Sequence, residues 1–155
     1  MFINSLGTTL HMWDASITSL ADERLCLRYD KRGHGGSRNA DGPYSIEQFS
    51  ADLNQLLTGL DILPRVVIGI SIGGLIAMDY ALRYGAELDG LILANTAAQI
   101  GSPEGWQQRI EAVQRRGLKA MVTEIVPHWF AEGLLHSHPN RYQYYASMLA
   151  AQSVA

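Results

Sequence analysis

A serine between glycines, in the run Gly-Ile-Ser-Ile-Gly at residues 69–73, is the feature that most constrains this chain. The run Arg-Val-Val-Ile precedes it, and the helix-like run Gly-Leu-Ile-Ala-Met follows at residues 74–78. A strand, a sharp turn and a helix with serine at the apex form a nucleophile elbow, in which the hydroxyl stands clear of the sheet. The pattern therefore predicts an α/β fold with Ser71 as a candidate nucleophile. The alternative is a glycine-rich turn of another α/β protein, in which Ser71 only caps the helix.

Composition indicates a soluble globular protein and excludes several classes of partner. The 155 residues are 47% hydrophobic and 17% charged, which is an ordinary balance. The formal net charge of -3 provides no basic face, so neither nucleic acid nor an anionic membrane is an expected partner. No apolar run approaches the roughly twenty residues of a transmembrane helix, and the first residues lack the charged region of a signal peptide. We therefore expect a cytoplasmic protein, and the sequence gives no oligomeric state.

Short apolar runs alternate with helical patterns in the first hundred residues. These strand-like runs occupy residues 25–29, 66–68 and 88–94, and residues 2–4 resemble the end of a further strand. Strands that alternate with helices predict a parallel sheet with helices on both faces.

Two helices are predicted from the spacing of apolar residues in the same part of the chain. The first spans residues 45–60, where Ser45 and Gln48 have the spacing of a capping box. The second spans residues 72–84 and is followed by Gly85, which suits a left-handed C-terminal cap.

The pattern changes after residue 100, where helical segments follow one another without a strand. Ser102 can cap a helix, Pro103 suits its first turn, and Glu104 lies near the positive end of the helix dipole. Further helical patterns occur at residues 106–116, 118–126 and 140–149. The sequence therefore predicts two parts, an α/β core over residues 1–100 and a helical region over residues 101–155.

Segments beyond the elbow carry a more particular likeness. They are Asn-Ser-Leu-Gly-Thr at residues 4–8 and the runs at residues 10–14, 28–35, 91–98 and 101–110. In these segments the chain resembles the α/β-hydrolase family and, within it, the 3-oxoadipate enol-lactonases. The resemblance covers essentially the whole chain, which corresponds to only the middle of such an enzyme. It implies a partial α/β-hydrolase core followed by a helical cap, with both parts incomplete.

The resemblance assigns roles to three residues. Ser71 would be the nucleophile, and two backbone N–H groups would hold the oxyanion of the tetrahedral intermediate. One donor is Ile72, directly after the nucleophile, and the other is Leu6, in the loop after an earlier strand. The alternative for residues 4–8 is a simple turn.

The helical region covers the substrate pocket in this family, so its aromatic and basic residues are candidates for substrate contact. Trp106 and Trp129 could form an apolar wall of the pocket, or could hold the cap helices together. Arg109, Arg115 and Arg116 could bind the free carboxylate of an acidic lactone. The more common role of such arginines is to form a solvated helix face.

The histidines do not suggest a triad or a metal site. Asp30, His34 and Ser37 are close in sequence, whereas triad residues come from separate loops, and His34 in its glycine-bounded loop is interpreted as structural. The remaining candidates for a metal site, in the helical region, lack a carboxylate at a familiar spacing; they are His128, His136 and His138. We expect no metal and no cofactor.

The triad of this family is only partly present in the sequence. The family needs serine, then an acid, then histidine, in that order along the chain. Asn95 follows the run at residues 88–94 and cannot act as the acid, and no histidine lies where the family has its base. We therefore expect the chain to be a fragment of a longer enzyme, with the acid and the histidine outside it and with an exposed apolar sheet edge.

The functional expectation follows from the resemblance. The protein would be a carboxylic-ester hydrolase with a small lactone or ester as its partner, and would convert 3-oxoadipate enol-lactone to 3-oxoadipate in aromatic degradation. A general carboxylesterase or a perhydrolase of the same fold is the first alternative, because fold does not fix substrate. A non-catalytic fragment or binding module is the second.

Overall fold

A computed structural model of the chain describes residues 1–39 and 42–154, and these form two compact units. The sheet unit is Met1–Ile100, and the helical unit is Gly101–Ala155. The sequence-based ranges 1–100 and 101–155 also contain Ala40, Asp41 and Ala155, which lie outside the described residues.

The sheet unit contains three parallel strands in the order β1-β2-β3. They are β1 (Phe2–Ile3), β2 (Val66–Ile70) and β3 (Gly90–Ala94). In register, Ile3 is the partner of Gly69, and Gly69 is the partner of Leu93. Because the strands are parallel, the segments that follow β1 and β2 leave the sheet at the same edge. This arrangement confirms the predicted partial α/β-hydrolase core.

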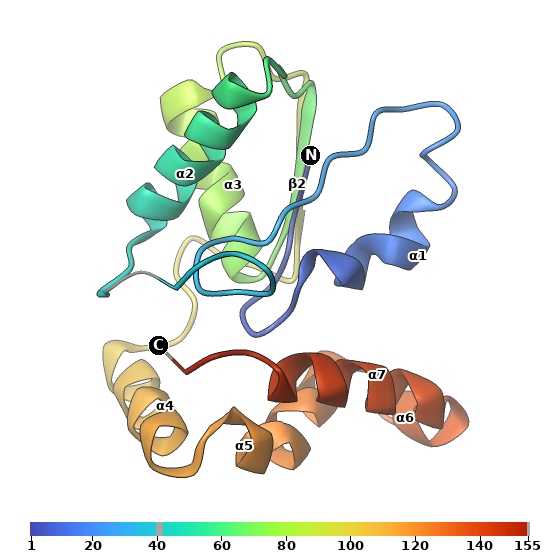
Figure 1. Ribbon diagram of the computed structural model, residues 1–155, viewed down its shortest axis with the longest axis vertical. Coiled ribbons are helices and arrows are strands. Elements are labelled where there is room, and N and C mark those ends of the chain that lie inside the picture. Colours follow the sequence, from blue (N-terminus) through green and yellow to red (C-terminus); the bar gives the residue numbers. More distant parts are fainter. Residues whose placement is uncertain (40–41, 155) are drawn as a thin grey trace. The chain divides into compact units, whose positions relative to one another are not determined.

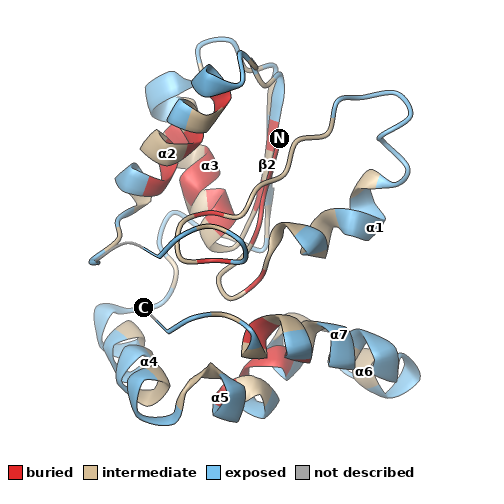
Figure 2. Ribbon diagram, in the orientation of Figure 1, coloured by how far each residue is buried: buried red, intermediate tan, exposed pale blue. Residues whose placement is uncertain are grey.

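Two helices pack against one face of the sheet, as Figure 1 shows for α2 (Ile46–Gly59) and α3 (Ile72–Tyr84) beside β2. The fully buried side chains of the core come from the sheet and from these helices, and include Ile3, Leu53, Val67 and Ile76. Figure 2 shows the buried positions along β2, α2 and α3. On the other face, Phe2 contacts Trp13 of η1 (Leu10–Trp13), with ring centroids 5.2 Å apart. The short helix α1 (Asp14–Ile17) follows η1.

The capping box predicted for α2 is present. Ser45 accepts a hydrogen bond from the Gln48 N–H, and the Gln48 side chain accepts one from the Ser45 N–H. These two bonds satisfy N–H groups that the first turn of a helix leaves without partners.

Two predictions about local structure were wrong. Residues 25–29 form no strand, and only Arg28 makes an isolated bridge, to Phe2. Of the two residues of β1, only Phe2 pairs with this run, so no ladder forms. Gly85 ends α3 with φ -88° and is not left-handed. A Cβ at Gly85 would lie 2.5 Å from the Ala81 carbonyl oxygen, so glycine is required there by close approach of the backbone.

The helical unit consists of helices around a small apolar cluster. The helices are α4 (Pro103–Arg116), α5 (Leu118–Ile125), η2 (Val126–Trp129), α6 (Leu134–Ser137) and α7 (Pro139–Ala150). Ser102 caps α4 by accepting a hydrogen bond from the Gly105 N–H, as its sequence predicts. The cluster is formed by Met121, Ile125, Val126 and Leu149. Within the described residues of the whole chain, no helix has both the length and the apolar character that crossing a membrane requires.

Candidate active site

Ser71 occupies a strained turn between β2 and α3. Its backbone has φ 55° and ψ -124°, a conformation that a residue with a side chain adopts rarely. A Cβ at Gly69 would lie 2.2 Å from the Gly73 carbonyl oxygen, and one at Gly73 would lie 2.4 Å from that of Ile3. Both glycines are therefore required by the close approach of the elbow, the helix and β1.

The backbone of Ser71 is anchored, while its side chain is not. Its N–H donates to the Ala94 carbonyl at 3.1 Å, and its carbonyl accepts from Thr96 Oγ1 at 2.7 Å. The Ser71 hydroxyl makes no cap to α3 and has no hydrogen-bond partner among the described residues. The alternative interpretation, in which the Ser71 side chain only caps α3, is therefore wrong.

The segment after β1, residues 4–8, is a turn that we call the 4–8 loop. Asn4 and Thr8 are buried, the Asn4 side-chain amide donates to the Thr8 carbonyl, and Thr8 Oγ1 donates to the Ser5 carbonyl at 2.9 Å. Within the described part of the chain, the N–H of Leu6 has no hydrogen-bond acceptor, and neither has that of Ile72 at the start of α3. Two unpaired donors thus follow the ends of β1 and β2, at the same edge of the sheet as Ser71.

A second loop, residues 30–38, forms hydrogen bonds to the 4–8 loop through two buried side chains. Lys31, which is 1% exposed, donates from Nζ to the Ser5 carbonyl at 2.8 Å and to the Asn4 carbonyl at 3.3 Å. The His34 Nε2 accepts from the Gly7 N–H at 3.1 Å, and its Nδ1 lies 3.1 Å from the Arg32 carbonyl. This pair of contacts fits the neutral tautomer with the proton on Nδ1.

Burial changes the proton affinity of both side chains. It lowers the pKa of Lys31 to about 7, against the opposing effect of the Asp30 charge. Burial, followed by the positive charge of Lys31, lowers the pKa of His34 to about 4. His34 is therefore neutral near pH 7 and can accept the hydrogen bond from Gly7. Sequence reasoning treated His34 as structural and missed Lys31, although a lysine two residues after the apolar run at residues 25–29 is an available signal.

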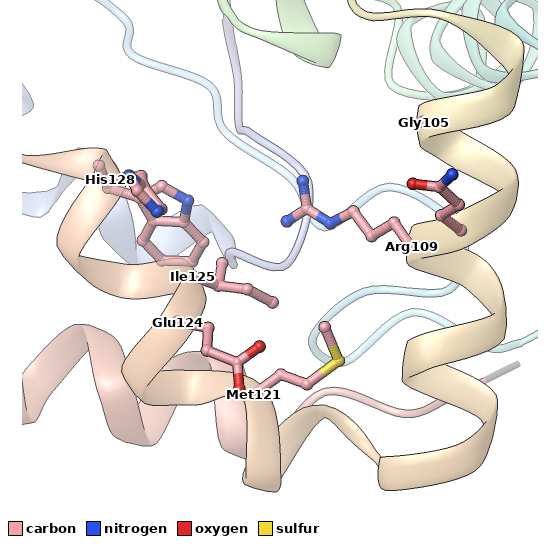
Figure 3. A pocket seen from close by; sticks show the side chains of 8 residues that line it. Gly105, Arg109, Met121, Glu124, Ile125 and His128 are labelled. Atoms are coloured by element: carbon pink, nitrogen blue, oxygen red, sulfur yellow. The ribbon is translucent and has the colours of Figure 1, made fainter.

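The helical unit contains a cavity of about 480 Å³ lined by side chains of α4, α5 and η2. Figure 3 shows Arg109 pointing into it from α4, opposite Met121, Ile125 and His128. Trp129 lines the same cavity. This volume is in the range of small-molecule sites.

The other predicted residues of the helical unit lie in different settings. Trp106 lies 5.5 Å from the Arg109 guanidinium, measured to the ring centroid, and supports that side chain through a cation–π contact. Arg115 donates to the Glu111 carbonyl, and Arg116 pairs with the Glu124 carboxylate, so both are on the solvated face. Burial lowers the pKa of Arg109, which has no acidic partner among the described residues.

The three histidines of the helical unit are exposed. His128 lines the cavity, and His138 lies 2.9 Å from the Ser137 hydroxyl. In the described ranges, 1–39 and 42–154, no three side chains of the metal-binding types come together as a possible site.

Comparison with known proteins gives consistent likenesses. A family model, Hydrolase_4, described as serine aminopeptidase S33, matches residues 20–154. The chain is 38% identical to 3-oxoadipate enol-lactonase 2 of Acinetobacter baylyi over 139 residues, and 32% identical to enol-lactonase 1 of the same organism over 140 residues. Each match covers 90% of this chain and 52% of the relative, so the chain spans about half the length of these curated relatives.

Solved structures show the same likeness. The enol-lactonase of Burkholderia xenovorans superposes with a TM-score of 0.94 and 35% identity, over 99% of this chain and 59% of that one. A thermophilic esterase of Thermogutta terrifontis superposes with a TM-score of 0.89 and 29% identity, over 99% of this chain and 58% of that one. Both carry the arrangement of strands and helices described above.

Proposed function

The chain belongs to the α/β-hydrolase family and is related to enol-lactonases and esterases, and from that premise we propose that Ser71 is the nucleophile of a lactone hydrolase. The substrate proposed is 3-oxoadipate enol-lactone, which the enzyme opens to 3-oxoadipate. The observation that carries the proposal is the elbow, which leaves the Ser71 hydroxyl without a hydrogen bond in the described structure and leaves the Leu6 and Ile72 N–H groups without acceptors.

The reaction proceeds by acyl transfer. Ser71 Oγ attacks the lactone carbonyl carbon and gives up its proton to a general base, while the N–H groups of Leu6 and Ile72 hold the oxyanion. The ring C–O bond then breaks, and the leaving enol oxygen takes up a proton before tautomerising to a ketone. Water attacks the acyl-enzyme in the same way and releases the carboxylate product and Ser71. Because an enol is a better leaving group than an alkoxide, the first step needs little general-acid assistance.

The general base is proposed to come from outside the described residues. His34 cannot serve, because its two ring nitrogens are engaged with Gly7 and Arg32. No other histidine forms a hydrogen bond with Ser71 in the part of the chain that the structure describes. We therefore propose that a histidine and its acidic partner, both outside the described residues, activate Ser71.

An acidic substrate is supported by Arg109. Its guanidinium points into the cavity of the helical unit and has no carboxylate partner among the described residues. Arginine binds a carboxylate through two parallel hydrogen bonds, which are strongest where water is excluded. We propose that the cavity of the helical unit binds a carboxylate at Arg109, with Trp129 as part of its apolar wall and Trp106 as the support of Arg109.

A general carboxylesterase is the second candidate function, because the esterase of Thermogutta terrifontis is also similar over nearly the whole chain. The two candidates differ in the relative kcat/KM for an enol-lactone and for a neutral aryl ester. An enol-lactonase has the larger value for the lactone, and a general esterase has the larger value for the aryl ester. A binding module would hydrolyse neither.

The proposal is tested by Ser71→Ala in the protein as its native host makes it, assayed with purified 3-oxoadipate enol-lactone. We expect kcat to fall by about 10³-fold or more, because the covalent route is lost. The matched control is Ser16→Ala, an exposed serine of α1, which should keep the wild-type rate. Hydrolysis that continues undiminished in Ser71→Ala would contradict the assignment.

A further inference from the structure

We propose that Lys31 and His34 are positioning residues for the oxyanion hole, and that together they fix the direction of the Leu6 N–H. This inference rests on the proposed function, since Leu6 acts as a donor only if Ser71 forms a tetrahedral intermediate. It concerns two buried polar side chains to which the reaction steps above give no role.

The planarity of the peptide bond connects Lys31 to Leu6. The Ser5 carbonyl and the Leu6 N–H belong to one peptide group, so an interaction that fixes the carbonyl oxygen also fixes the opposite direction of the N–H. Lys31 Nζ donates to that oxygen at 2.8 Å, and Thr8 Oγ1 donates to it at 2.9 Å. Donors at the carbonyl also polarise the peptide group and make its N–H a stronger donor.

His34 fixes the next peptide group. The Leu6 carbonyl and the Gly7 N–H share that plane, and the N–H donates to His34 Nε2 at 3.1 Å. The two peptide groups on either side of the Leu6 Cα are thus held from one neighbouring loop. Gly7 has φ 74°, which explains how the chain turns between the two contacts without steric conflict.

The burial of Lys31 argues for a role beyond packing. Its ammonium group is almost fully buried and forms no ion pair with a carboxylate in the described structure. A buried charge without an ionic partner costs stability, and an apolar side chain of similar length would avoid that cost. The lowered pKa of Lys31 agrees with this cost. The negative charge of Asp30 acts in the opposite direction and raises the pKa of Lys31. The hydrogen bond that the Lys31 ammonium group donates to the Ser5 carbonyl therefore explains the buried charge better than packing does.

The first test is Lys31→Met, which keeps the apolar stem and removes the charge. We expect kcat for the enol-lactone to fall by about 10²-fold, the loss typical of a weakened oxyanion donor. KM should change by less than about threefold, and the melting temperature should stay the same or rise because a buried charge is removed. Lys119→Met, at the other lysine of the chain, is the matched control and should keep the wild-type kcat. A folded Lys31→Met with kcat within about twofold of wild type would overturn the proposal.

The second test uses two variants of His34. His34→Phe removes the acceptor of the Gly7 N–H and should lower kcat to a similar extent, whereas His34→Gln retains an acceptor and should recover most of it. If a Lys31 variant does not fold, the comparison of folded Gln and Phe variants decides, and equal kcat values for the two would overturn the proposal. Ser71→Ala in the same assay separates this result from the proposed function. If Ser71→Ala is inactive while all folded variants at Lys31 and His34 keep the wild-type kcat, only the present inference fails.

Discussion

The two units differ in what surrounds their glycines and polar side chains. In the sheet unit, a Cβ at Gly73 would meet backbone atoms at 2.4 Å, whereas in the helical unit a Cβ at Gly117 or Gly133 would meet nothing within 4 Å. All five buried polar residues among those described belong to the sheet unit; they are Asn4, Thr8, Lys31, His34 and Ser50. The sheet unit thus fixes its geometry through the backbone and buried polar groups. The helical unit depends on the packing of its apolar side chains.

The largest effect is expected for Gly73→Ala, which tests whether the backbone of the sheet unit is as tightly packed as this comparison indicates. Because the added Cβ would lie 2.4 Å from the Ile3 oxygen and 2.8 Å from that of Asn4, the start of α3 must move away from β1. We expect a loss of about 3 kcal/mol or more in the free energy of unfolding, measured in urea. The control is Gly59→Ala at the exposed end of α2, where nothing lies within 4 Å of the new Cβ. A wild-type midpoint for Gly73→Ala would show that the elbow is not tightly packed.

The sequence predicted those parts of the fold that depend on neighbours along the chain. The capping box at Ser45 and the elbow at Ser71 depend on residues within a few positions, and the structure contains both. Residues 25–29 were predicted as a strand because they are apolar. Their pairing depended on β1, of which only Phe2 forms a bridge with them. Apolar character alone does not show whether a neighbouring strand will pair with a segment.

The candidate site was predictable at Ser71 and Ile72 and much less so around Leu6. Lys31 and His34 lie 26 and 27 residues from their partners Ser5 and Gly7, so no local pattern links them. Only the placement of two loops at one sheet edge brings these groups together. The available clue was chemical, namely a lysine and a histidine in a short loop after an apolar run.

The second prediction concerns the pH dependence of stability in the sheet unit. The pKa of His34 is lowered from 6.5 to about 4 in the folded protein, so the unfolded chain binds more protons between these values. Stability should therefore fall as the pH drops from 6.5 to 4, by about 3 kcal/mol from this residue. Lys31, with a pKa of about 7, is largely charged in both states within this window.

Urea unfolding of wild type and of His34→Gln at pH 7, 5.5 and 4 measures this contribution. Other carboxylates also titrate in the window, so the difference between the two proteins is the relevant quantity. The stability lost on acidification should be larger for wild type. Parallel curves for the two proteins would mean that His34 is not buried in its neutral form.

The third prediction tests the cavity of the helical unit. Arg109→Met should raise KM for the acidic enol-lactone by about 10- to 100-fold, the equivalent of one lost charge-assisted hydrogen-bonded pair. KM for a neutral aryl ester should change by less than about threefold, and the unfolding midpoint of the sheet unit should not move. Arg115→Met, on the same helix but facing solvent, is the matched control. Equal increases of KM for both substrates would indicate lost packing and would argue against carboxylate binding.

The smallest effect is expected at Gly105, the third residue of α4, where the prediction has the opposite sign from that at Gly73. A Cβ at Gly105 would lie 3.4 Å from Ser102 Oγ, a tolerable contact, and the N-cap hydrogen bond from the Gly105 N–H would remain. Alanine reduces the conformational freedom of the unfolded chain, so Gly105→Ala should stabilise the helical unit by about 0.5 to 1 kcal/mol. Hydrogen exchange of the α4 amides measures this gain without relying on a global transition. Faster exchange in Gly105→Ala would mean that glycine is required in α4 as it is at the elbow, and the contrast between the two units would then be weaker than the structure indicates.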